Sequence, residues 1–289
     1  MYNPILNRTN PVPQRDIQRR EDRNRGIHLK VSIENMSFSY NPEVPVLKDV
    51  NLEMEGPRFI SILGPNGVGK STLIHCINKI LTPTNGDVLI DGRSVKDITI
   101  KEMARMVGYV PYSANLTFPM SVLDTVLMGR HPFSKWKSVD EDLDRAYDVL
   151  DLLGITDLAM RSFGELSAGQ HQKVMLAKGL VQDTKILLLD EPTSNLDIRH
   201  QLEVTKLLKR LSVEKEMLIV MISHDLNIAA KFSDEIILMS KGTVFAVGKP
   251  EEVMTVENIR EVYGVESRIV DDGVPHIILE DSIAECNNG

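Results

Sequence analysis

One eight-residue segment constrains the fold of this chain more than any other. Gly64-Pro65-Asn66-Gly67-Val68-Gly69-Lys70-Ser71 fits the pattern G-x-x-x-x-G-K-[ST], and Thr72 follows it. The apolar run 59–63 before it is typical of a buried strand, and the run 72–77 after it is typical of a helix. Glycines let successive backbone N–H groups turn toward an anion, and the N-terminus of the helix adds its dipole. The segment therefore predicts a loop that binds the phosphates of a nucleoside triphosphate.

Two side chains of this loop carry the expected chemistry. Lys70 supplies a positive charge for the β and γ phosphates, and Ser71 supplies a hydroxyl ligand for Mg²⁺. A glycine-rich turn with a chance lysine is the alternative interpretation. The strand–loop–helix context favours the nucleotide site.

Composition narrows the compartment and the partners. The chain has 289 residues, with 33 Lys and Arg against 41 Asp and Glu, and the net charge of −8 argues against binding bare nucleic acid through the whole surface. Cys76 and Cys286 lie far apart, which favours a reducing compartment over a disulfide framework. No apolar run reaches the length of about 18 residues that a membrane helix needs, and no secretory signal begins the chain. We expect a soluble, cytosolic protein with no nucleic-acid partner.

The order of the apolar runs predicts an α/β fold. Residues 31–40 and 50–54 are expected to form antiparallel strands beside the core. The continuous runs 185–190 and 218–222 are typical of parallel strands buried on both faces. The expected helices of the core are 72–77, 167–181, 196–211 and 225–232, with a hairpin at 235–246. We expect a P-loop nucleotidase core with a mainly parallel, doubly wound sheet, an N-terminal antiparallel β subdomain and an inserted helical subdomain.

Three segments flank or interrupt the core domain, which we place at 30–250. Residues 1–29 are rich in Asn, Pro, Arg and Asp without apolar periodicity, so they are expected to be a disordered leader. The helical subdomain is expected at about 113–165, where the apolar spacing becomes helical. The C-terminal extension, 251–289, is expected to hold two short helices and one final strand at 269–279.

A pair of carboxylates follows the apolar run 185–189. Asp190, at the end of a buried strand beside a phosphate-binding loop, is placed to hold Mg²⁺ through water. Glu191 then lies within reach of a water molecule that attacks the γ-phosphate, and it is the candidate general base. The alternative is a charged turn that only caps the next helix.

Two further motifs are weak evidence for a phosphate contact when taken alone, but their positions in the chain strengthen that interpretation. Leu166-Ser167-Ala168-Gly169-Gln170 begins a predicted helix, where Ser167 is a candidate N-cap and the small residues let a phosphate approach the helix amides. His224 follows the buried run 218–222. A lone histidine there is more often a capping or structural residue, but its position favours a contact with the γ-phosphate.

Together these motifs resemble the ATP-binding cassette (ABC) ATPases over roughly residues 30–250. The residues that carry the resemblance are, in order, 64–72, 166–170, 186–191, 194–197 and His224. The resemblance implies an ATP hydrolase that works as a head-to-tail dimer around two ATP molecules and Mg²⁺. Each ATP would lie on the phosphate loop of one subunit and under residues 166–170 of the other.

The resemblance also implies roles for single residues. Asp197 would lie in the segment that crosses the dimer interface, and His224 would be the switch histidine at the γ-phosphate. Tyr40 matches the aromatic residue that stacks on adenine, although a tyrosine in a strand more often packs in the core.

One position departs from the family pattern. After the predicted strand 107–110 and Pro111, the family normally has a glutamine that touches Mg²⁺ and the attacking water, and this chain has Tyr112. A phenol is a poor substitute for an amide carbonyl near magnesium. Asn115 carries an amide and is the candidate replacement. We expect altered positioning of Mg²⁺ and water, with ATP binding retained.

The separate cassette indicates the ATPase subunit of a prokaryotic importer, because exporters usually carry the cassette on the membrane chain. The segment 118–133 resembles importers of iron-siderophore, haem and cobalamin complexes. The resemblance implies integral membrane permease subunits as partners, indirectly a substrate-binding protein, and a peripheral location at the cytoplasmic face of the membrane. Two alternatives remain: a cytosolic ABC ATPase without a permease, such as one for iron–sulfur assembly, and a regulatory subunit with little turnover. Glu191 argues against the second.

Overall fold

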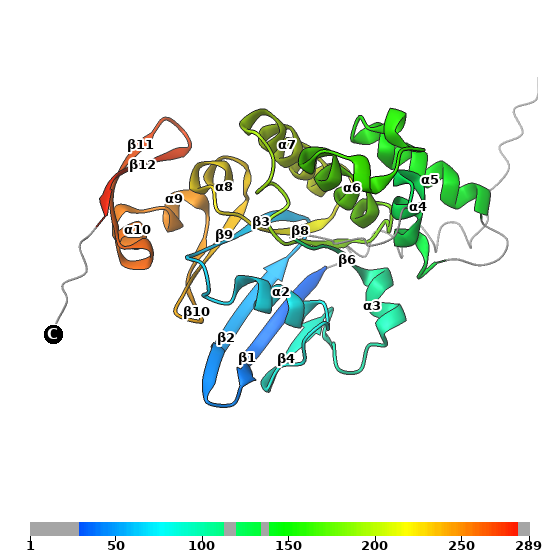
Figure 1. The fold of residues 1–289 in the computed structure, drawn as a ribbon. Helices are drawn as coiled ribbons and strands as arrows, with labels where there is room; N and C mark the ends of the chain where they lie inside the picture. Colours follow the sequence, from blue (N-terminus) through cyan, green and yellow to red (C-terminus); the bar gives the residue numbers. More distant parts are fainter. Residues whose placement is uncertain (1–28, 113–119, 134–138, 283–289) are drawn as a thin grey trace, which may run out of the picture.

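The computed structural model describes residues 29–112, 120–133 and 139–282 (Figure 1). The sequence expectations for residues 1–28, Asn115, the first part of the segment 118–133 and Cys286 lie outside these ranges. The strands are β1 (Lys30–Asn41), β2 (Val44–Glu55), β3 (Arg58–Leu63), β4 (Asn85–Ile90), β5 (Arg93–Ser94), β6 (Val107–Val110), β7 (Ile186–Leu189), β8 (Leu218–Ile222), β9 (Glu235–Ser240), β10 (Thr243–Gly248), β11 (Val265–Asp271) and β12 (Pro275–Ser282).

Along the chain, most helices follow one strand of the core and precede the next. The α-helices are α2 (Lys70–Ile77), α3 (Ile100–Met106), α4 (Val122–Leu127), α5 (Val139–Leu152), α6 (Ala168–Leu180), α7 (Ile198–Glu214), α8 (Leu226–Phe232), α9 (Pro250–Val253) and α10 (Val256–Tyr263). The short 3-10 helices are η1 (Met128–Arg130), η2 (Thr156–Leu158) and η3 (Phe163–Glu165). No helix among the described residues is long and apolar enough to cross a bilayer.

The central sheet has the strand order β10-β9-β3-β8-β7-β6. All of its strands are parallel except β10, which pairs antiparallel with β9 at one edge. Strands β7 and β8 are buried along their whole length, as their unbroken apolar sequences predict. Because the strands are parallel, the segments that follow β3, β6, β7 and β8 all leave the same edge of the sheet. That edge is where an open α/β sheet binds its ligands.

A second sheet, with the order β2-β1-β4-β5, is antiparallel throughout. Helix α2 lies between the two sheets (Figure 1), and one apolar core joins side chains from both sheets and from this helix. The predicted N-terminal antiparallel subdomain is therefore confirmed. The predicted strand 50–54 is the second half of the longer strand β2.

Helices α6 and α7 cover the other face of the central sheet, α4 and α5 pack beside α6, and all four contribute to a second core shared with the sheet (Figure 1). A buried ion pair fastens the helical subdomain: Arg130 Nε donates to Asp142 Oδ1 at 2.7 Å, and another guanidinium nitrogen donates to the Val181 carbonyl at 3.1 Å. The Arg130 guanidinium also lies 4.6 Å from the centre of the Phe133 ring. These contacts join α4, α5 and the end of α6 into one body.

The C-terminal section adds a third core beside β9. Its two helices, α9 and α10, are as expected, but the prediction of a single final strand at 269–279 is wrong. The chain instead forms the antiparallel hairpin β11–β12, in which Val270 pairs with His276. Gly273 allows the turn because it adopts a φ of 101°, and its N–H donates to the Asp271 carboxylate. Asn227 of α8 fixes the hairpin through both backbone groups of Ile277.

Candidate active site

The phosphate loop leaves β3 and enters α2 in a conformation that requires glycine. Gly64 has a φ of 145°, and a Cβ there would lie 2.3 Å from the Met239 carbonyl oxygen. Gly69 has a φ of 99°, and its Cβ would lie 2.7 Å from the Leu47 side chain. The two glycines therefore fix the loop between β9 and β2 with its amides free to face an anion.

Lys70 is the first residue of α2 and is only 5% exposed. Its ammonium donates to the carbonyls of Gly64 at 2.7 Å and Pro65 at 2.9 Å, so the loop itself holds it. Burial lowers the pKa of Lys70 below its usual range, while the carboxylates of Glu191 and Asp190 act in the opposite direction. The cation therefore lies between the loop and both acidic residues that follow β7.

Ser71 and Asp190 come together from different elements. The Ser71 hydroxyl donates to Asp190 Oδ1 at 3.0 Å. Burial raises the pKa of the Asp190 carboxyl above its usual range, and the hydrogen bond from Ser71 opposes this shift. A hydroxyl and a carboxylate oxygen at this separation are the hard ligands that Mg²⁺ takes alongside phosphate oxygens, so this pair fits a magnesium ion.

Glu191 meets His224 at the carboxyl ends of β7 and β8. His224 Nε2 lies 2.5 Å from Glu191 Oε1, within ion-pair distance. Glu191 has a φ of 51°, an uncommon backbone conformation for a residue with a side chain, of the kind often found at functional sites.

Two hollows meet at Glu191. One of about 320 Å³ is lined by the phosphate loop, Tyr40 and Glu191, and we call it the loop cleft. The other, of about 390 Å³, lies between Glu191, His224 and the first turn of α7. The predicted base therefore borders the space where the predicted phosphates would lie.

Tyr40 is 66% exposed and does not pack in the core. Its ring meets Phe38 edge-on with centres 4.9 Å apart, and its hydroxyl lies 3.4 Å from Thr72 Oγ1. The ring therefore lies exposed at the rim of the loop cleft, where it is free to contact a ligand.

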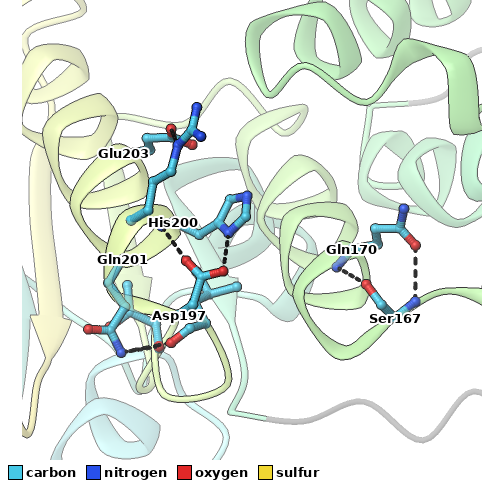
Figure 2. Close-up of polar contacts among 9 residues, drawn as sticks. Ser167, Gln170, Asp197, His200, Gln201 and Glu203 are labelled. Atoms are coloured by element: carbon cyan, nitrogen blue, oxygen red, sulfur yellow. Dashed lines mark hydrogen bonds and ion pairs between the residues drawn. The ribbon is translucent and has the colours of Figure 1, made fainter.

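Residues 166–170 lie away from the loop cleft of their own chain. Ser167 is the N-cap of α6 and forms a capping box with Gln170: its hydroxyl accepts from the Gln170 N–H, and the Gln170 side chain accepts from the Ser167 N–H. Asp197 is the N-cap of α7 (Figure 2), and its hydrogen bonds from His200 hold the pKa of its carboxyl below the usual range. Among the described residues, none that lines the loop cleft also lines the hollow of about 300 Å³ beside Ser167 and His200.

Two contacts near Asp190 carry no sequence motif. His75 Nε2 on α2 lies 2.9 Å from the Tyr109 hydroxyl on β6, and the rings meet edge-on. Burial and the charge of Asp190 raise the pKa of Tyr109, and the charge of His75 lowers that of Asp190. The pair therefore joins α2 to β6 beside Asp190.

Tyr112 follows β6 at the same edge of the sheet and is 46% exposed. We expect Tyr112→Gln to change the ATP hydrolysis rate by roughly threefold or more and the dissociation constant for ATP by less than about twofold, because on our hypothesis this position affects the attacking water and not the phosphate loop. Steady-state hydrolysis and nucleotide titration measure the two quantities. Tyr147→Gln, at an exposed position on α5, is the matched control. An unchanged hydrolysis rate for Tyr112→Gln would contradict the hypothesis that Tyr112 alters the positioning of Mg²⁺ and water.

Comparison with known proteins identifies the family. The sequence profile of the ABC transporter family matches residues 47–194, about half of the chain. The chain belongs to the ABC transporter family. An uncharacterised ABC transporter ATP-binding protein of Methanocaldococcus jannaschii is 43% identical, covering 86% of this chain and 97% of its own. The ferric enterobactin transport ATP-binding protein of Escherichia coli is 36% identical, covering 83% of this chain and 89% of its own.

Solved structures agree on the fold. An inward-facing ABC transporter assigned to the metal-chelate type superimposes with a TM-score of 0.76 at 29% identity, covering 88% of this chain and 98% of that one. A dimeric ATP-binding cassette in a post-hydrolysis state, bound to ADP and phosphate, gives a TM-score of 0.70 at 30% identity, covering 76% and 98%. The α/β fold with a P-loop core and mainly parallel sheet is confirmed, and this ABC protein is a transport ATPase that binds ATP.

Proposed function

We propose that this ABC protein is the ATP-hydrolysing subunit of a membrane importer for an iron-chelate, haem or cobalamin-type substrate. The similarity to the ferric enterobactin transport protein and to the metal-chelate type transporter supports this substrate class. The observation that carries the enzymatic part is the contact between Glu191 and His224 at the border of the loop cleft. The protein would act at the cytoplasmic face of the membrane, bound to integral permease subunits and indirectly to a substrate-binding protein.

The residues of the loop cleft divide the work of phosphoryl transfer. Lys70 and the loop amides bind the β and γ phosphates of ATP, and Tyr40 stacks on the adenine. Ser71 and Asp190 would hold Mg²⁺, which neutralises charge on the phosphates when it is bound. Glu191 accepts the proton of the attacking water. His224, 2.5 Å from Glu191, is proposed as the switch histidine that contacts the γ-phosphate.

The second copy of the chain completes the site. Ser167 and Gln170 lie in a hollow separate from the loop cleft of their own chain, and the related cassette that holds ADP and phosphate is dimeric. A head-to-tail dimer would bring the N-terminus of α6 from one subunit to the nucleotide on the other, where its free amides and dipole favour phosphate. Asp197 at the start of α7 would lie at the contact between the two subunits.

The proposed division at about residue 250 follows the chain and does not correspond to a separate core. Helices α9 and α10 share a core with α8, β9 and Leu63, and so pack on the ATPase domain, while the helical subdomain packs on the opposite side of the molecule (Figure 1). We keep the ATPase domain at 30–250, with a helical subdomain at about 113–165 and an extension from 251.

The partner can be tested by affinity purification from membranes solubilised in mild detergent. We expect the tagged chain to retain an integral membrane protein with several spanning helices, because an importer subunit needs a permease to move its substrate. The Glu191→Gln variant with ATP should strengthen the retention if closure of the dimer tightens the complex. Recovery of soluble partners alone would favour the alternative, a cytosolic ABC ATPase without a permease.

A further inference from the structure

The segment 191–197 joins Glu191, the proposed base, to Asp197, the proposed dimer contact. Few hydrogen bonds form within this segment. The Ser194 N–H and hydroxyl donate to the Glu191 carbonyl at 3.3 and 3.1 Å, and the Leu196 N–H donates to the Thr193 carbonyl at 3.1 Å. Ser194 and Asn195 are exposed. The segment therefore depends on neighbouring elements for its shape.

Gln201, in the first turn of α7, supplies that support. Its side-chain Nε2 donates to the carbonyls of Thr193 at 3.1 Å and Leu196 at 3.0 Å (Figure 2). A primary amide nitrogen has two hydrogens, so one side chain satisfies both carbonyls. Gln201 also lines the hollow of about 390 Å³ that Glu191 and His224 border.

The same stretch contacts two further parts of the site. One residue before Gln201, the His200 backbone and ring nitrogens each lie 2.9 Å from a different oxygen of the Asp197 carboxylate (Figure 2). Leu196 is buried and packs against the start of α6, where its Cδ2 atom lies 3.4 Å from the place of a Cβ on Gly169. A shift at α6 or at Asp197 thus reaches the carbonyls that Gln201 holds.

We propose that Gln201 is a positioning residue that fixes the segment 193–196, so that Glu191 and Asp197 move as one unit. This inference rests on the proposed function, because it takes Glu191 as the base and Asp197 as a dimer contact. Gln201 does not touch the nucleotide. It acts on hydrolysis by keeping Glu191 at the angle that closure of the dimer sets.

The test removes the two donors while it keeps the size of the side chain. In Gln201→Glu a carboxylate faces two carbonyls, and we expect kcat for ATP hydrolysis to fall roughly tenfold, with KM changed by less than about twofold. Gln201→Lys keeps a donor that can reach both carbonyls, as Lys70 does in the loop, and should retain most of kcat. Arg199→Ala, at a neighbouring residue whose side chain is 85% exposed, is the matched control and should leave both constants unchanged.

Repeating the test in the Glu191→Gln variant distinguishes a positioning role from general destabilisation of the protein. If Gln201 acts through Glu191, Gln201→Glu should lower the single-turnover rate in the wild type but cause little further loss in Glu191→Gln. Should Gln201→Glu not fold, Gln201→Met serves as the donor-free variant. Proportional losses in both backgrounds, or a normal kcat for the donor-free variant, would overturn the positioning role alone. Normal turnover in Glu191→Gln itself would instead overturn the proposed function.

Discussion

The Glu191→Gln variant is expected to hydrolyse ATP at least about 100-fold more slowly than the wild type, because an amide cannot accept the proton of the attacking water. The amide keeps the shape of the side chain, so it can remain beside His224, whose Nε2 lies 2.5 Å from the present carboxylate. The binding residues Lys70 and Ser71 are untouched. ATP should therefore bind and hold the subunits together without being consumed.

Two measurements check this expectation. Phosphate release gives the turnover, and size-exclusion chromatography with ATP and Mg²⁺ should show a dimer that the wild type forms only transiently. Glu214→Gln makes the same chemical change at an exposed position at the end of α7 and should behave as the wild type. Turnover near the wild-type rate in Glu191→Gln would mean that another group activates the water.

The phosphate loop and the acidic pair could be predicted from sequence because their chemistry is local. The glycines at 64 and 69 are needed by the backbone of the loop itself, and Asp190 and Glu191 follow directly on a strand that reads as buried. Parallel strands then bring these ends to one edge whatever the order of the strands. This is why the predicted loop, Asp190, Glu191 and His224 lie together.

Contacts set by pairing over long distances could not be predicted. Strand β3 lies between β8 and β9, about 160 to 180 residues further along the chain, and no local pattern gives that order. The hydrogen bonds from Gln201 to Thr193 and Leu196 could not be predicted either. The sequence around Gln201 indicates only the start of a helix, because an aspartate followed by polar residues is typical of many helix starts.

The error in the C-terminal section has a local cause. Val270 and Ile278 are both partly exposed, so the alternation that marks a strand is weak on each arm of the hairpin. The turn at Gly273 lies inside the predicted strand and was the available signal, because glycine after acidic residues is typical of a turn. Helix α3 is absent from the sequence predictions, although the capping box of Thr99 and Glu102 marks its start.

The Lys70→Ala variant is expected to weaken ATP binding at least about 100-fold, because it removes the buried cation that faces the β and γ phosphates. The loss has a second source. The Lys70 ammonium also donates to the carbonyls of Gly64 and Pro65, so alanine leaves the start of the loop without its support. Titration with a fluorescent ATP analogue in the presence of Mg²⁺ measures the dissociation constant.

The fold should survive this change, which makes the result interpretable. Lys70 is buried at a cost that lowers its pKa, and removal of a desolvated charge offsets the loss of its hydrogen bonds. Thermal unfolding without nucleotide should therefore differ little from the wild type, whereas the stabilisation by ATP should disappear. Lys231→Ala, at an exposed position on α8, controls for the loss of a positive charge. A dissociation constant within about twofold of the wild type would contradict the role of Lys70 in the loop and, with it, the loop cleft as the site of the triphosphate.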